Sequence, residues 1–99
     1  MQKIILHPEA RTEMLDAAAY YEEASSGLGY AFLAEIETVF ATIKDCPDRR
    51  QILKTPYRRA ILQRFPYGVI YRNQEKTCYV VAIMHLKRKP GYWLHRVTE

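Results

Sequence analysis

A run of chemically capable side chains lies near the C-terminal end of this chain of 99 residues. The segment His85–Trp93 reads HLKRKPGYW, so it holds one imidazole, three consecutive cations and two aromatic rings. An imidazole can move a proton near neutral pH, cations neutralise the phosphates of a polyanion, and aromatic rings stack on bases. The same pattern also fits a solvated strand end followed by a hydrophobic anchor, and both interpretations stay open at this point.

Attack of an RNA 2′-hydroxyl on the adjacent phosphate is one reaction that such residues could promote. It needs an acceptor for the 2′ proton, cations around the phosphate, a donor for the leaving 5′ oxygen and a ring that holds the base. The candidate catalytic residues are Arg72, His85 and Tyr92. The candidate residues for binding nucleic acid or another target are Arg59, Arg64, Lys87, Arg88 and Lys89.

Each of these candidates also has a purely structural interpretation. Arg64 and Arg72 could be strand-surface cations paired with glutamates, and His85 could be a strand-end histidine that is hydrogen-bonded to the backbone. The three consecutive cations could be a solvated charge run. Trp93 and the tyrosine before it could form a hydrophobic plug that pins the C-terminal tail onto the helices.

The charges divide unequally along the chain. Residues 1–45 carry three cations and eight anions, a net charge of −5, whereas residues 46–99 carry twelve cations and three anions, a net charge of +9. The two halves add to the net charge of +4. This division predicts two different surfaces, of which the basic one favours an anionic partner such as nucleic acid. An ordinary basic face without a partner is the alternative.

The length and composition limit the other possibilities. The chain of 99 residues predicts one domain, residues 1–99, and its apolar and aromatic content of 48% is enough for a core. No apolar run approaches the roughly 20 residues needed to cross a bilayer, and the N-terminus lacks a signal-peptide layout, so we expect no membrane partner and a cytoplasmic location. Cys46 and Cys78 are then expected to be reduced thiols. No motif predicts a metal site or a cofactor.

The first half of the chain predicts a strand and two helices. Lys3–Leu6 is a short apolar run typical of a strand, and Pro8 suits the first turn of a helix because its missing N–H costs nothing there. Ser25–Gly27 ends that helix with residues that favour caps and turns. A second apolar stripe with helical spacing extends from Phe32 to Ile43, and a proline follows it closely. The short connection predicts an antiparallel helical hairpin.

The second half predicts strands. A short extended piece is possible at Gln51–Leu53, and longer strands are expected at Arg59–Phe65, Val69–Arg72 and Thr77–Met84, the last two joined by a hairpin at Asn73–Lys76. These last three strands form an antiparallel meander. The predicted fold class is therefore α+β, with an N-terminal strand and a helical hairpin packed on a mostly antiparallel sheet.

The alternation of side chains along the last strand makes a prediction about the open face of the sheet. Cys78, Val80, Ala82 and Met84 are expected to face the helices, because small residues suit that packing. The other set is expected to face away from them: Thr77, Tyr79, Val81, Ile83, His85 and Lys87. If Arg64 and Arg72 reach that side as well, the open face becomes a basic concavity with aromatic residues.

Several segments together resemble one known family. They are HPEA at the first helix, YYEEASSGLGYAFLAEIE at the helical hairpin, RRAILQRFPYGVIYR, and VVAIMHLKRKPGYW. This pattern covers nearly the whole chain and resembles the RelE/ParE superfamily of bacterial type II toxin–antitoxin toxins, in particular its ParE-like, plasmid stabilisation branch. The segments RFPYxVxYR and AxxHxKRxPxYW carry most of the likeness.

The resemblance implies a β-α-α-β-β-β fold like that of microbial RNases, and a toxin that a cognate antitoxin neutralises by masking it or by displacing its C-terminal element. RelE-like members cut mRNA on the ribosome without a metal ion, whereas ParE-like members inhibit DNA gyrase without catalysis. Arg72, Lys87 or Arg88, and Tyr92 lie in regions that correspond to the RelE-like site, but the Pro90–Gly91 step is not RelE-like. Whether the chain is an enzyme stays open, and a degenerate module that only binds its antitoxin or nucleic acid is the alternative.

Overall fold

A computed structural model describes residues 3–97 of the chain. The helices and strands follow in the order β1 (Lys3–Leu6), α1 (Pro8–Ala24), α2 (Leu28–Asp45), β2 (Gln51–Lys54), β3 (Tyr57–Ile61), β4 (Tyr67–Gln74), β5 (Thr77–His85) and a 3₁₀ turn, η1 (Leu94–Arg96). This order confirms the predicted β-α-α-β-β-β class. The extended piece expected at Gln51–Leu53 is β2, an additional strand at the edge of the sheet.

Residues at the turn between α1 and α2 determine how the helical hairpin closes. The carboxylate of Glu22 accepts hydrogen bonds from the backbone N–H groups of Gly27 and Gly29, both at 2.9 Å, so it caps the start of α2. Gly27 has a φ of 86°, which glycine adopts without strain. A Cβ atom on Gly29 would stand 2.5 Å from the carbonyl oxygen of Ala18, so the two helices approach closely only because this residue has no side chain.

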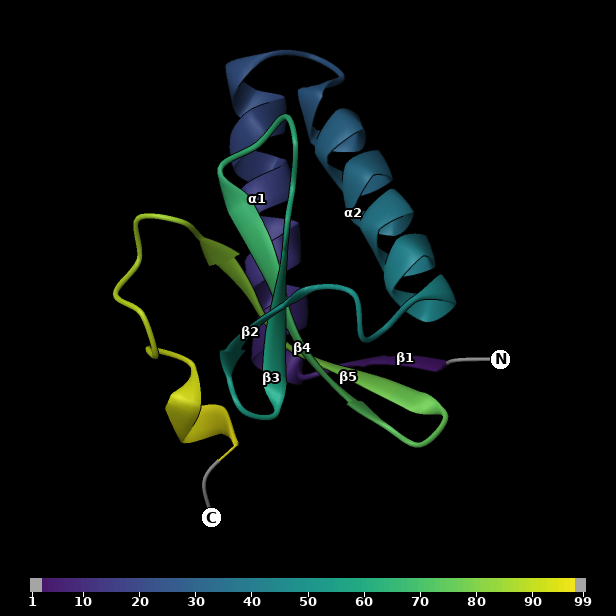
Figure 1. Cartoon of the computed structure of the whole chain (residues 1–99). Coiled ribbons are helices and arrows are strands. Elements are labelled where there is room, and N and C mark those ends of the chain that lie inside the picture. Colours follow the sequence, from purple (N-terminus) through teal and green to yellow (C-terminus); the bar gives the residue numbers. More distant parts are fainter. Residues whose placement is uncertain (1–2, 98–99) are drawn as a thin grey trace.

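The five strands form one sheet in the order β1-β5-β4-β3-β2, in which β1 runs parallel to β5 and the other neighbours are antiparallel. Figure 1 shows both helices on one side of the sheet, while the C-terminal tail (yellow) leaves β5 and returns toward β2 and β3. The strand expected at Arg59–Phe65 ends earlier, at Ile61. The chain turns there because Leu62 and Phe65 both insert into the core between sheet and helices.

A β-bulge interrupts the alternation of side chains in β5. Ile70 lies opposite Ala82 and Tyr71 lies opposite Val80, so Val81 has no opposite residue in β4. An extra residue moves every later side chain to the other face of the sheet. The helix-facing residues are therefore Cys78, Val80 and Ile83, while Ala82 and Met84 face away.

The predicted alternation is thus wrong beyond the bulge. Ala82 and Met84 were expected to face the helices, and Ile83 and His85 were expected to face away, but the four positions are exchanged. The prediction assumed a regular strand, and nothing in a uniformly apolar run signals the extra residue.

A second apolar cluster covers the face of the sheet that lies away from the helices. Trp93 from the tail is its largest member, with an exposed fraction of 1%, and its ring centroid lies 5.1 Å from that of Tyr57 in β3. Trp93 is therefore a hydrophobic plug, but it pins the tail onto the sheet and not onto the helices as expected. Within residues 3–97, neither helix is long and apolar enough to cross a membrane.

Candidate functional site

The three candidate catalytic residues do not meet at one place. Arg72 lies opposite Tyr79 on the face of the sheet away from the helices, where both residues line a small pocket of 250 Å³. His85 lies opposite Tyr67 on the helix side, with ring centroids 5.0 Å apart. The bulge at Val81 is the cause, because without it His85 would lie on the same face as Arg72.

His85 is held in place by the backbone of the tail. Its Nδ1 atom accepts a hydrogen bond of 3.0 Å from the N–H of Lys87. In the neutral ring the proton is then on Nε2. The residue lines the space between α1 and β5. This contact is the structural role that the sequence left as an alternative, and it leaves one ring nitrogen free to act on a ligand.

Tyr92 is engaged in a buried network centred on Glu13 of α1. Its hydroxyl donates a hydrogen bond of 2.6 Å to the Glu13 carboxylate. Burial, and then the adjacent Glu13 carboxylate, raise the pKa of Tyr92 above its usual range. The raised pKa makes the hydroxyl a weaker proton donor, and its proton is already directed at Glu13, so Tyr92 is a poor general acid.

The Glu13 carboxylate accepts three further hydrogen bonds. One comes from the N–H of Ile83 at 2.9 Å, and two come from the guanidinium of Arg96 at 2.7 and 3.0 Å. Burial by itself raises the pKa of Glu13, but the hydrogen bonds from Arg96, Tyr92 and Ile83 outweigh it and lower that pKa. Sequence reasoning missed this network, because its contacts join residues 70 or more positions apart and no local pattern points to Arg96.

The candidate binding residues are spread over three parts of the surface. Arg59 lies on the face of the sheet away from the helices, next to Gly68. Arg64 is exposed in the loop before β4, where Glu35 of α2 accepts a hydrogen bond from its backbone N–H and not from its guanidinium. Lys87, Arg88 and Lys89 are exposed in the tail, and the Arg88 guanidinium carbon stands 4.0 Å from the centroid of the Tyr92 ring.

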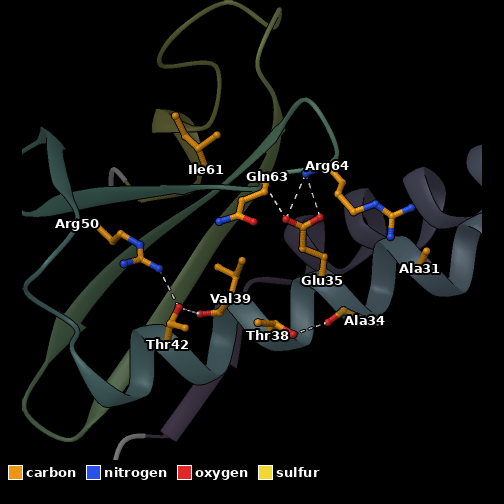
Figure 2. Close-up of a pocket in the computed structure, with 10 residues that line it drawn as sticks. All are labelled: Ala31, Ala34, Glu35, Thr38, Val39, Thr42, Arg50, Ile61, Gln63 and Arg64. Carbon is orange, nitrogen blue, oxygen red and sulfur yellow. Dashed lines mark hydrogen bonds between the residues drawn. The ribbon is translucent and has the colours of Figure 1, made fainter.

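A groove of 410 Å³ runs between α2 and the end of β3 (Figure 2). Glu35 stands at one end of it and binds the backbone N–H groups of Gln63 and Arg64. At the other end the Arg50 guanidinium donates a hydrogen bond of 2.8 Å to the Thr42 hydroxyl. The groove therefore offers charged groups at both ends and apolar side chains between them.

Two adjoining pockets of 320 and 460 Å³ lie between α1 and the adjacent ends of β4 and β5. They share three ring-bearing residues, Tyr20, Tyr67 and His85. The first pocket also contains Asp16 and Arg88, and it borders Glu13. In the described part of the chain, residues 3–97, no group of three His, Cys, Asp or Glu side chains could hold a metal ion.

Comparison with known proteins gives the family. The sequence model described as the ParE toxin of the type II toxin–antitoxin system parDE matches residues 4–90. A solved structure described as a chromosomal ParDE toxin–antitoxin system from P. aeruginosa is similar to this chain, with a TM-score of 0.62 at 14% sequence identity, over 88% of this chain and 98% of that one. At such identity the likeness supports the fold alone. A search of curated proteins found no match. Because the family model spans well over half of the sequence, the chain belongs to the ParE toxin family of type II toxin–antitoxin systems.

Proposed function

We propose that this toxin arrests bacterial growth by binding a protein target, DNA gyrase, and not by cutting mRNA. The observation that carries the proposal is the bulge at Val81, which separates Arg72 from His85 across the sheet. RNA cleavage needs a proton acceptor, a proton donor and a cation within reach of one phosphate. Groups on opposite faces of a sheet cannot reach the same phosphate.

The state of Tyr92 supports the same conclusion. A catalytic tyrosine would have to release its proton or place its ring against a base. Here the hydroxyl is bound to Glu13, and the cations of Arg88 and Arg96 stand 4.0 and 5.1 Å from the ring centroid. The residue fastens the tail to α1, which is a structural role.

Inhibition of a protein target needs no proton chemistry, only a complementary surface. The exposed cations Lys87, Arg88 and Lys89 make the tail strongly basic and suit an anionic region of a partner. Under this proposal the chain acts in the cytoplasm, where gyrase acts on DNA.

Neutralisation by a cognate antitoxin is part of the proposal, and the groove between α2 and β3 suits an extended segment of such a partner. β2 pairs with β3 only as far as the Gln51–Arg59 pair, so the edge of β3 at Ile61 is not covered by β2. Ile61 is 50% exposed and lines the groove together with Arg50 and Arg64. An added strand with acidic side chains would gain backbone hydrogen bonds, an apolar contact and ion pairs.

One culture and one purified assay test the proposal. The toxin gene is induced with and without the neighbouring gene, while growth and the 5′ ends of cellular transcripts are followed. In parallel, purified toxin is added to gyrase and relaxed plasmid. We expect growth arrest that the neighbour relieves, inhibited supercoiling and intact transcripts.

Other outcomes would assign a different function. New transcript ends that require the ribosome, with normal supercoiling, would overturn gyrase inhibition in favour of RNA cleavage. A folded protein that binds its antitoxin but affects neither readout would identify the degenerate binding module.

A further inference from the structure

The space between α1 and the ends of β4 and β5 has a composition that the proposed function does not use. We define the aromatic trough as the two adjoining pockets lined by Tyr20, Tyr21, Tyr67 and His85, with Asp16 and Arg88 at one end. Along α1 it extends from Glu13 to Tyr21, which is about 12 Å at 1.5 Å per residue.

The rings of the trough are fixed by one another. Tyr67 makes edge contacts with His85 at 5.0 Å and with Tyr21 at 6.2 Å between centroids, and Tyr20 meets Tyr21 at 5.3 Å. Tyr20 is nevertheless 68% exposed, so much of its ring faces solvent at the mouth of the trough. An exposed ring held by rigid neighbours is a ready surface for stacking, because little conformational freedom is lost on binding.

Two polar residues at the end of the trough, Asp16 and Arg88, have no ion-pair partner within residues 3–97. The carboxylate of Asp16 has no hydrogen-bond or ion-pair partner in this part of the chain. The guanidinium of Arg88 stacks on Tyr92 but has no carboxylate partner there. Glu13, which also borders the trough, is already bound by Arg96. Asp16 therefore offers an acceptor, and Arg88 offers a donor next to the two other tail cations.

We infer that the aromatic trough binds a nucleotide unit of a single-stranded nucleic acid whose base carries an exocyclic amino group. The base would stack on Tyr20, its amino group would donate to Asp16, and its phosphate would lie on Arg88 and the adjacent lysines. Each group matches a known contact: a ring platform for the base, a carboxylate for an amino group such as cytosine N4, and cations for the phosphate.

Two other kinds of ligand match these groups less well. A cationic side chain would suit Asp16 and the rings but would meet the positive charges of Arg88 and its neighbours. An apolar peptide would suit the rings but would bury Asp16 and Arg88 without partners. Only a ligand that has a flat ring, a donor and an anionic group uses all three parts of the trough.

Cytidine and uridine monophosphate make a matched pair of probes, since they differ chiefly in an amino group against a carbonyl oxygen. Full-length toxin is titrated at low salt with each, with inorganic phosphate and with acetyl-arginine amide, while NMR follows the resonances of Tyr67 and His85. We expect saturable shifts, with cytidine monophosphate bound about 5-fold or more tightly than uridine monophosphate, and phosphate weaker than both.

Variants assign the contacts. Asp16→Asn is expected to remove the preference for cytidine, and Tyr20→Ala is expected to weaken both nucleotides by about 5-fold. The matched control is Tyr30→Ala, because Tyr30 is 75% exposed on α2 and lies outside the trough, and it should leave both affinities unchanged. Equal affinities for the two nucleotides, or no gain over phosphate, would overturn the assignment. So would tighter binding of acetyl-arginine amide. None of these measurements involves gyrase, so the outcome is independent of the target proposed above.

Discussion

The carboxylate of Glu13 and the guanidinium of Arg96 form a paired hydrogen bond, at 2.7 and 3.0 Å, that joins residues 83 positions apart. It connects α1 to the turn η1 at the end of the tail. The same guanidinium donates to the carbonyl oxygen of Val81 at 2.9 Å, so the bulge in β5 is part of the connection. The tail is thus fastened by ionic contacts of Arg96 with Glu13 and Glu9 on the α1 side, and by Trp93 on the sheet.

Removal of the carboxylate should destabilise the protein strongly. In Glu13→Ala the Arg96 guanidinium, whose side chain is 5% exposed, loses its main partner, and the backbone N–H of Ile83 loses its acceptor. We expect a loss of about 3 kcal/mol in the free energy of unfolding, measured by urea denaturation. Glu23→Ala, an exposed position on the same helix, is the control and should cost less than about 0.5 kcal/mol. Similar costs for the two variants would show that the network contributes little.

The contribution of Glu13 should depend on pH in a defined direction. Its pKa in the folded protein lies below the ordinary value of 4.5 because its hydrogen bonds outweigh the cost of burial. The stabilisation is therefore complete above that ordinary value and is lost as the pH falls through the folded pKa. The measurement is the difference in unfolding free energy between the natural protein and Glu13→Gln, from pH 7 down to pH 3. We expect this difference to shrink only at the acidic end, and a difference that grew on acidification would contradict the assignment.

Trp93 should be important for stability through its volume and not through its N–H group. The indole nitrogen is buried without a hydrogen-bond partner in the described residues, whereas the ring packs on Tyr57. We expect Trp93→Ala to cost about 3–5 kcal/mol and Trp93→Phe to cost distinctly less, since the phenyl ring keeps part of the packing and no hydrogen bond is lost. Thermal unfolding, followed by circular dichroism, compares the stabilities of the two variants. Equal costs would mean that the N–H group has a partner after all.

The hydroxyl of Tyr92 should be needed for stability and not for toxicity. Tyr92→Phe removes the hydrogen bond to Glu13 and should reduce the unfolding free energy by about 1–2 kcal/mol. Growth arrest on induction should persist, because the proposed mechanism involves no proton transfer by this residue. The comparison needs equal amounts of folded protein in the cells. Loss of toxicity at equal folded amounts would return Tyr92 to the list of catalytic residues.

The sequence by itself determined where the two helices begin and end. Pro8 marks the start of α1, Ser25–Gly27 separates the helices, and Pro47 follows the end of α2, because glycine and proline act on the backbone locally. The likeness to the family could also be found from the sequence, since it depends on segments that can be compared position by position.

Only the tertiary structure decided which side chains share a site. The insertion of Val81 into β5 depends on pairing with β4, and it alone moves His85 to the helix side, away from Arg72. The contact between Glu13 and Arg96 likewise depends on how the tail folds back along the sheet. Side-chain alternation and long-range pairing are properties of the assembled sheet. One unpaired residue exchanges the two faces for every later side chain of the strand, and the composition of the strand carries no signal of it.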